Sequence, residues 1–279
     1  MDNDMATPSL AKNSCSSIPR KFALSKDYFV HGNTFDFGTC GDIAIVWNKE
    51  KEQQRVAKIQ TIADAADRYF VRKEIRMHCR VKRHPHIVTM YASYEERDCI
   101  SIVLEKVRGK NLFEYSRDNR DLLPESIVVR WTRQLLNALD YMHGKYIAHL
   151  DVKPENILLS DNTLGADVKL CDFGCANNVG QDGIFLRYPI GTPLYCSLEM
   201  VDCQSKKVCT KSDIFSLGLV VHFVLSKRDI FYGDELNGRE DIFQRIRHQR
   251  IVFDRSWTLK WRSDAVVDFM SKLIERNKW

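Results

Sequence analysis

Residues 149–156 read His-Leu-Asp-Val-Lys-Pro-Glu-Asn, and residues 171–174 read Cys-Asp-Phe-Gly. These two stretches place Asn156 five positions after Asp151, and a second aspartate, Asp172, a further 16 positions along the chain. A positioned carboxylate can accept the proton of an attacking hydroxyl, and asparagine and aspartate oxygens are ligands that Mg²⁺ prefers. The two stretches therefore predict a phosphoryl-transfer site.

The order and spacing of these residues resemble the catalytic loop and the metal-binding triplet of eukaryotic protein kinases, and the resemblance extends from about Tyr28 to the last residue. It implies an α+β fold with two lobes, of which the N-lobe is small and β-rich and the C-lobe is larger and mainly helical. It also implies ATP and Mg²⁺ as cofactors. In this family Asp151 would be the catalytic base, Lys153 would neutralise the moving phosphoryl group, and Asn156 and Asp172 would hold the metal.

The overall composition is that of an ordinary globular protein, with 44% hydrophobic and 28% charged residues in 279. The longest apolar run, residues 214–225, is too short to cross a bilayer of about 30 Å, and the N-terminus has no apolar segment of the secretory type. We therefore expect no membrane contact and a location in the cytoplasm, with the nucleus as the alternative. The net charge of +5 permits acidic partners, but no nucleic-acid-binding motif occurs, so nucleic acid is not an expected partner.

The chain divides by composition into an extension and one kinase domain. Residues 1–25 contain few large apolar side chains and are expected to form a flexible extension. Residues 26–279 form the predicted domain, with the N-lobe at about 26–108 and the C-lobe at about 109–279. A helix is expected at about 62–82, and β-rich runs are expected at 28–37, 43–47, 56–59, 88–94 and 100–104.

Lys58 ends the apolar run Val-Ala-Lys at residues 56–58, which resembles the third-strand motif of the kinases. The resemblance implies that Lys58 holds the α- and β-phosphates of ATP and pairs with a helical glutamate. Glu74 is the partner by elimination as well, because it is the only glutamate between Lys58 and the end of the following β-rich run. At helical spacing Glu74 shares a face with Phe70, Met77 and Val81, so we expect it to point inward. The alternative is an exposed helix carboxylate.

Residues 35–43 resemble a degenerate glycine-rich loop, in which Gly38 and Gly41 stand for the second and third glycines of the family and Asp36 replaces the first. Gly41 precedes Lys58 by 17 positions, the length of a hairpin, so this loop would fold over the nucleotide. The extra carboxylate is expected to weaken nucleotide affinity. With the hinge at residues 104–107, the expected nucleotide-binding residues are Phe35, Gly38, Thr39, Cys40, Gly41, Ile43, Lys58, Glu105 and Val107.

Two further segments match the kinase plan: residues 191–195 as the loop beside the substrate, and residues 213–218 as the helix that braces the catalytic loop. Three features depart from it. Residues 196–199 read Cys-Ser-Leu-Glu where the family usually has Ala-Pro-Glu, and Leu150 stands where most kinases have an arginine. The sequence also stops at Trp279, before the arginine that usually pairs with that glutamate.

Lys153 together with Thr192 is the pattern of serine/threonine kinases, so we expect protein substrates that carry Ser or Thr. The combination of His-Leu-Asp with Asp-Phe-Gly-Cys resembles the Mos kinases, and the loosened motifs would also suit a virus-encoded kinase. The rival hypothesis is a pseudokinase scaffold that binds partners without phosphoryl transfer. The sequence does not predict an oligomeric state.

The loop at residues 175–191 bears on regulation. It contains no Ser or Thr, and the only side-chain hydroxyl in it is that of Tyr188. Since Leu150 also removes the usual arginine receptor for a loop phosphate, we expect activity without phosphorylation of this loop.

A second feature is a run of arginines at four-residue spacing in the predicted helix. One hypothesis is an acidic docking partner at this stripe, and the alternative is a solvated face eased by Asp64 and by Glu95 or Glu96. The stripe consists of Arg68, Arg72, Arg76 and Arg80.

Overall fold

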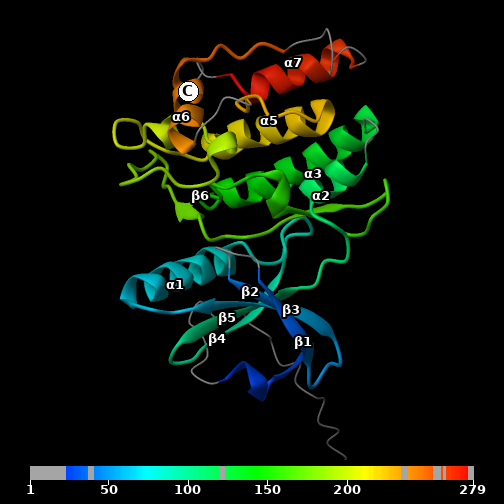
Figure 1. Cartoon of the computed structure of the whole chain (residues 1–279), viewed down its shortest axis with the longest axis vertical. Helices are drawn as coiled ribbons and strands as arrows, with labels where there is room; N and C mark the ends of the chain where they lie inside the picture. The colour runs from blue at the N-terminus through cyan, green and yellow to red at the C-terminus, as the bar shows by residue number, and fades with distance from the viewer. Residues whose placement is uncertain are drawn as a thin grey trace, which may run out of the picture.

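The computed structural model describes residues 23–36, 41–119, 123–233, 238–253, 259 and 262–275. A five-stranded sheet with one helix forms the lower lobe in Figure 1, and a mainly helical body forms the upper lobe. The two-lobed α+β fold expected from the sequence is therefore confirmed.

The N-lobe sheet is antiparallel with the strand order β1-β2-β3-β5-β4. Its register places Lys58 opposite Ile43 on one side and opposite Ile102 on the other, so the lysine lies near the middle of the sheet. Each of the five predicted β-rich runs overlaps one strand, although the run at 88–94 begins two residues before β4 and residue 37 lies outside the described residues. The strands are β1 (Tyr28–Asp36), β2 (Asp42–Asn48), β3 (Gln54–Thr61), β4 (Met90–Glu95) and β5 (Cys99–Glu105).

Helix α1 (Ala65–Arg80) begins at Asp64, whose side chain accepts hydrogen bonds from the first-turn backbone N–H groups of Ala66 and Asp67. Its buried face packs on β4 and β5 through a cluster that includes Val71 and Ile75. The helix lies on the side of the sheet that faces the C-lobe (Figure 1). This position brings the inward side chains of α1 to the junction between the lobes.

The N-terminal boundary of the folded domain differs slightly from the sequence-based expectation. A short 3₁₀-helix, η1 (Leu24–Lys26), packs beside the sheet, and Leu24 is only 5% exposed. The ammonium of Lys49 donates to the carbonyl of Ser25 over 2.5 Å. Leu24 and Ser25, which were expected in the flexible extension, therefore belong to the N-lobe, because the apolar face beside Tyr28 and Tyr94 covers the leucine.

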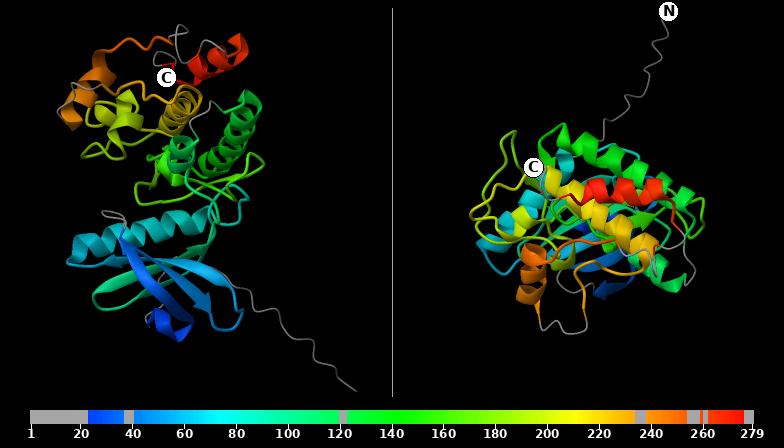
Figure 2. Two further views of the ribbon diagram at one scale, coloured as in Figure 1. Left: turned by 45° about the vertical axis from the view of Figure 1, so that its right-hand side comes forward. Right: turned by 90° about the horizontal axis from the view of Figure 1, so that it is seen from above.

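The C-lobe is built around α5 (Lys211–Ser226), which is buried along almost its whole length between α3 and α7 (Figure 2). No described helix is long and apolar enough to span a membrane. The other C-lobe elements are α2 (Leu112–Asp118), α3 (Glu125–His143), β6 (Ile147–Ala148), η3 (Pro154–Asn156), β7 (Ile157–Leu159), β8 (Val168–Leu170), β9 (Asn177–Asn178), η4 (Pro193–Tyr195), α4 (Leu198–Val201), α6 (Arg239–His248) and α7 (Asp264–Leu273).

The chain crosses between the lobes in the segment from Glu105, the end of β5, to Leu112, the start of α2. Within this segment a Cβ atom on Gly109 would lie 2.4 Å from the carbonyl oxygen of Leu159. Only glycine fits such a close approach of two backbones. The crossing thus runs directly beside the strand that follows the catalytic loop.

Candidate active site

The catalytic loop is held by a buried carboxylate of α5. Asp213 is fully buried, and its carboxylate accepts hydrogen bonds from the backbone N–H groups of His149 and Leu150, each with an N···O distance of 2.8 Å. The Nε2 atom of His143 lies 2.8 Å from the same carboxylate. Since Leu150 has a φ of 61°, in the left-handed region, these hydrogen bonds fix a backbone turn that a leucine rarely adopts. The bracing role expected for residues 213–218 is visible in these contacts.

Asp151, the expected catalytic base, is held by groups on both of its oxygens. Its Oδ1 atom accepts the backbone N–H and the hydroxyl of Thr192, over 2.9 and 2.7 Å. Its Oδ2 atom accepts the side-chain amide of Asn156 over 3.0 Å and lies 3.2 Å from the ammonium of Lys153. Lys153 also donates to the Thr192 hydroxyl over 2.7 Å. The carboxylate is therefore fixed against the loop beside the substrate, with a cation next to it.

Lys58 bridges the two lobes through two carboxylates. Its ammonium lies 2.9 Å from Glu74 of α1 and 2.9 Å from Asp172. Burial opposes the charged form of Lys58, but the two carboxylates outweigh it and raise the pKa of this lysine above its ordinary value. Gln60 donates to the second oxygen of Glu74 over 3.0 Å, so both oxygens of the buried glutamate have partners. Glu74 points inward, and the alternative of an exposed helix carboxylate is wrong.

Asp172 remains ionised despite burial, because Lys58 lowers its pKa to about 2. Its Oδ1 atom also accepts the backbone N–H of Gly174 over 3.2 Å. The next side chain, Phe173, is fully buried and stacks on His78 of α1, with the two ring centroids 4.3 Å apart. The aspartate is thus anchored to α1 both by charge and by packing.

The residues expected to hold Mg²⁺ are brought together by a small ladder. Strands β7 and β8 pair antiparallel, and the N–H of Cys171 donates to the carbonyl of Asn156 over 2.9 Å, so Asp172 follows directly beside Asn156. The amide nitrogen of Asn156 donates to Asp151, which leaves its amide oxygen as the group available to a cation. An amide oxygen and an ionised carboxylate form a donor set that suits Mg²⁺.

Part of the expected nucleotide-binding surface lies in described segments. Gly41 has a φ of 89°, and a Cβ atom there would lie 2.7 Å from the carbonyl oxygen of Ile59, so this position requires glycine. Phe35 pairs with Ile43 across the hairpin. The Glu105 side chain is engaged by Lys169 over 2.9 Å, and Val107 follows in the crossing segment. The expected positions Gly38, Thr39 and Cys40 lie outside the described residues.

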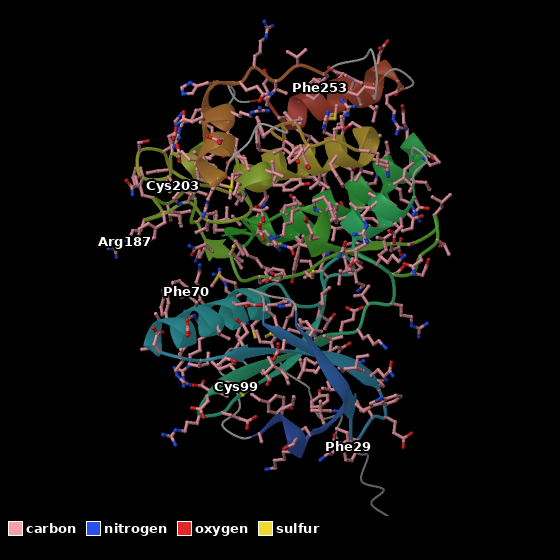
Figure 3. All side chains as sticks on the ribbon, viewed as in Figure 1. Phe29, Phe70, Cys99, Arg187, Cys203 and Phe253 are labelled. Carbon is pink, nitrogen blue, oxygen red and sulfur yellow. The ribbon has the colours of Figure 1, made fainter. Side chains whose placement is uncertain are left out.

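One expectation for α1 is wrong. The helical spacing puts Phe70 on the inward face with Glu74, but Phe70 is 58% exposed. Its side chain is labelled in Figure 3, and Met77 and Val81 are buried as expected. Among the described residues, the α1 side chains in the apolar cluster that packs on the sheet are Val71, Ile75 and Cys79, and Phe70 is not one of them.

The arginine stripe is partly neutralised within the chain. Glu95 forms ion pairs with Arg68 and Arg72, which leaves Arg76 and Arg80 as the exposed members of the stripe. Arg80 donates to the carbonyl of Lys145 over 3.0 Å. For Arg68 and Arg72, the structure therefore agrees with the alternative hypothesis of a solvent-facing helix surface, in which Glu95 neutralises the arginine charge. Asp64 serves as the helix cap.

Several contributors to the site had no sequence signal. His78 contacts Phe173, and Gln60 contacts Glu74, only because α1, β3 and the Asp-Phe-Gly segment meet in space. The hydroxyl of Ser212 donates to the Glu199 carboxylate at a distance of 2.7 Å, and the sequence had not indicated any partner for Glu199. Asp229 accepts the hydroxyl of Tyr195 over 2.8 Å. These pairs could not be predicted from the sequence, because the two residues of each pair meet only in the folded structure.

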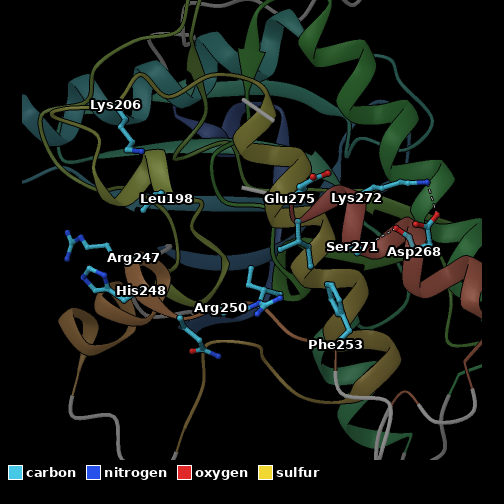
Figure 4. Close-up of a pocket in the computed structure, with 13 residues that line it drawn as sticks. Leu198, Lys206, Arg247, His248, Arg250, Phe253, Asp268, Ser271, Lys272 and Glu275 are labelled. Carbon is cyan, nitrogen blue, oxygen red and sulfur yellow. Dashed lines mark hydrogen bonds and ion pairs between the residues drawn. The ribbon is translucent and has the colours of Figure 1, made fainter. Parts of the chain in front are cut away.

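A surface pocket of about 770 Å³ lies between α4, α6 and α7 and shares no residue with the catalytic centre (Figure 4). Its lining includes Leu198, Arg247, His248 and Lys272. The candidate catalytic residues described above lie instead at the junction of the lobes.

Comparisons with known proteins agree with this geometry. The family model described as "Protein kinase domain" matches residues 30–278. Mouse death-associated protein kinase 2 is 31% identical over 214 residues, which cover 75% of this chain and 56% of that protein. Human myosin light chain kinase 3 is 28% identical over 284 residues, which cover 100% of this chain and 33% of that protein. The chain thus spans about half or less of the length of these relatives.

A solved structure shows the same fold. The twitchin kinase region from C. elegans superposes with a TM-score of 0.79 and 24% sequence identity, covering 93% of this chain and 45% of that one. The lysine, glutamate and two aspartates described above thus occur in a chain that matches the family over nearly its whole length. The chain belongs to the protein kinase family.

Proposed function

We propose that the chain is a serine/threonine protein kinase, which transfers the γ-phosphoryl group of ATP to a hydroxyl of a protein substrate. Members of this family use ATP and Mg²⁺. The observation that carries the proposal is the assembled set of Lys58, Glu74 and Asp172 on one side of the lobe junction, with Asp151 and Lys153 on the other. Positioning and electrostatics of this kind make up nearly all of phosphoryl-transfer catalysis.

The reaction follows from what these groups can do. The substrate oxygen forms a bond to the γ-phosphorus, the bond from that phosphorus to the β,γ-bridging oxygen breaks, and ADP leaves. Asp151 accepts the proton of the substrate hydroxyl, and Lys153 offsets the charge of the transferred group. Lys58 would contact the phosphates that remain on ADP. Asn156 and Asp172 would hold Mg²⁺, which would supply positive charge that offsets the charge of the phosphates.

Activity without phosphorylation of the loop at residues 175–191 is part of the proposal. The ion pair between Lys58 and Glu74 is formed, and strand β6 pairs with β9 at the start of this loop. The loop offers only one hydroxyl, that of Tyr188, whose side chain is exposed. These observations support a kinase that is active as synthesised.

The alternative is a pseudokinase scaffold. It is motivated by the altered glycine-rich loop and by Leu150, but it gives no reason for the contacts that hold Lys58, Asp151, Asn156 and Asp172 in place.

Three finer proposals rest on the sequence alone: a location in the cytoplasm, or alternatively the nucleus; a local relationship to the Mos kinases; and a viral origin. The proposed acidic docking partner is argued in the next subsection.

The test is phosphoryl transfer by the purified chain and by its Asp151→Asn variant. Transfer of radiolabelled phosphate from ATP to a generic basic protein substrate should occur at Ser or Thr and should require Mg²⁺. The variant should be slower by about 10² to 10⁴, and its melting temperature verifies that it is folded, because asparagine loses one of the two oxygens that accept hydrogen bonds from Thr192 and Asn156. Equal rates in the two proteins would refute the role of Asp151, and no transfer by either would favour the scaffold.

A further inference from the structure

The exposed face of α1 carries aromatic side chains that nothing in the described chain covers. Tyr69 and Phe70 are each 58% exposed, and their rings meet edge to face with centroids 5.6 Å apart. The guanidinium of Arg76 lies 5.7 Å from the centre of the Tyr69 ring. Single exposed hydrophobic residues are common on protein surfaces, but adjoining aromatics beside an arginine are typical of the anchor residues of protein interfaces.

The same face is cationic. Lys73, Arg76 and Arg80 follow one another on successive turns, and at about 100° per residue they lie within one sector of the helix with Tyr69. Among the described residues, no carboxylate forms an ion pair with any of these three cations, whereas Arg68 and Arg72, on the neighbouring sector, are both bound by Glu95.

Lys73 is half-buried, and burial lowers its pKa, with Cys175 acting against this effect and the nearby Arg76 acting in the same direction. A cation in such a place gains from a carboxylate brought by another molecule, because the new charge offsets both the burial and the repulsion. Arg187 of the C-lobe loop lies on the same side of the molecule as Phe70 and increases the positive charge there (Figure 3).

We propose that the face formed by Tyr69, Phe70, Lys73, Arg76 and Arg80, called here the α1 face, docks an acidic segment of a partner protein that carries a large apolar anchor residue. The acidic side chains would pair with the three cations. The anchor would cover the two aromatic rings.

A protein partner fits this face better than nucleic acid does. A phosphate backbone is bound along an extended track of cations. The residues that would extend the track around α1 are Arg68 and Arg72, and Glu95 already neutralises both. Charge and an apolar anchor confined to one helix face match a short peptide segment more closely.

Docking here would act on the helix that supplies Glu74. The α1 face and the Glu74 carboxylate lie on the same helix, and Glu74 must remain near Lys58 for the lobe junction to stay assembled.

The test selects peptides from a phage-displayed library of short random sequences on the immobilised full chain. The selected peptides are then measured by fluorescence anisotropy against wild type, against the Phe70→Ala/Arg76→Glu double variant, and against Arg76→Gln alone. The matched control is the Phe29→Ala/Lys51→Glu double variant, which removes an equally exposed aromatic ring and an exposed cation at the far end of the N-lobe. Melting temperatures verify that every variant is folded.

We expect the selected peptides to be rich in Asp and Glu and to contain a large apolar residue. Their dissociation constants should rise about tenfold or more in the double variant, by less in Arg76→Gln, and not in the control, and binding should weaken with added salt. Recovery of no binders, of binders without acidic enrichment, or of binders that the double variant holds equally well would overturn the proposal. So would displacement of the peptides by a DNA duplex that binds wild type more tightly. Because binding is measured without catalysis, the result does not depend on the proposed kinase activity.

Discussion

His78 is a buried histidine at the junction of α1, β4 and the Asp-Phe-Gly segment, and it should make the stability of the protein depend on pH. Its ring is 2% exposed, its Nε2 atom lies 2.7 Å from the carbonyl oxygen of Val88, and it stacks on Phe173 at an interplanar angle of 22°. Burial lowers the pKa of His78 to about 4, with the positive charge of Lys58 acting in the same direction. The folded protein therefore holds this ring neutral, with Nε2–H donating to Val88.

The sign and size of the effect follow from proton linkage. The unfolded chain binds a proton at His78 near pH 6.5, whereas the folded chain does so only near pH 4. Stability from this residue is thus complete above about pH 6.5 and falls progressively as the pH drops toward 4. At about 1.4 kcal/mol per pH unit, the loss between pH 7 and pH 5 is about 2 kcal/mol.

The assay is denaturant unfolding of the wild type and of His78→Gln at pH 7, 6 and 5. Glutamine keeps an N–H donor for Val88 but does not titrate. The free energy of unfolding should fall between pH 7 and pH 5 by about 2 kcal/mol less in the variant than in the wild type. His248→Gln is the control, because that side chain is exposed and should leave the wild-type pH dependence unchanged.

Two results would refute this reasoning. If wild type and His78→Gln lost equal stability between pH 7 and pH 5, the ring would not be held neutral by its surroundings. If the wild type lost less stability than the variant between pH 7 and pH 5, the histidine would be stabilised in its charged form, which would require a carboxylate facing it. Asp172 is the charged group nearby that acts in that direction.

Three further predictions concern the catalytic loop. Asp213→Asn leaves one oxygen to accept the N–H groups of His149 and Leu150, so thermal unfolding should show a loss of about 1 to 3 kcal/mol, with slower phosphoryl transfer. Gly191→Ala places a Cβ atom 2.4 Å from the carbonyl of Leu150 at a φ of 82°, so kcat should fall sharply, while a wild-type rate would contradict the close packing. Protein stripped of phosphate by a phosphatase, with removal verified by intact mass, should keep its activity; activity that returns only after loop rephosphorylation would contradict the proposal.

The sequence predicted those parts of the fold that depend on local pattern. Alternating apolar residues located all five strands of the N-lobe, and the fixed spacing of Asp151, Asn156 and Asp172 identified the residues that the β7–β8 ladder brings together. Glu74 followed by elimination, and the structure confirms its inward position. Each of these predictions rests on neighbours in sequence or on a motif with fixed spacing.

The predictions that were wrong or missing depend on contacts between distant segments. Phe70 has the right helical phase to be buried, but periodicity cannot show where the covering sheet ends. The sequence named Glu95 or Glu96 as the carboxylate that eases the arginine stripe, and only the position of β4 beside α1 decides for Glu95. For His78, the sequence gave no indication that a histidine would stack on Phe173.

The backbone geometry around Leu150 suggests how the catalytic loop is ordered without the arginine found in most kinases. The N–H of Leu150 is held by Asp213, and its carbonyl lies so near Gly191 that a Cβ atom there would clash. The loop beside the substrate therefore packs directly on the catalytic loop, and Thr192 continues this contact by donating to Asp151. A phosphate bound by an arginine would link the same two loops through a charge. Here the close approach of Gly191 to Leu150 and the hydrogen bonds from Thr192 to Asp151 link them, which supports the proposal that their order needs no phosphorylation.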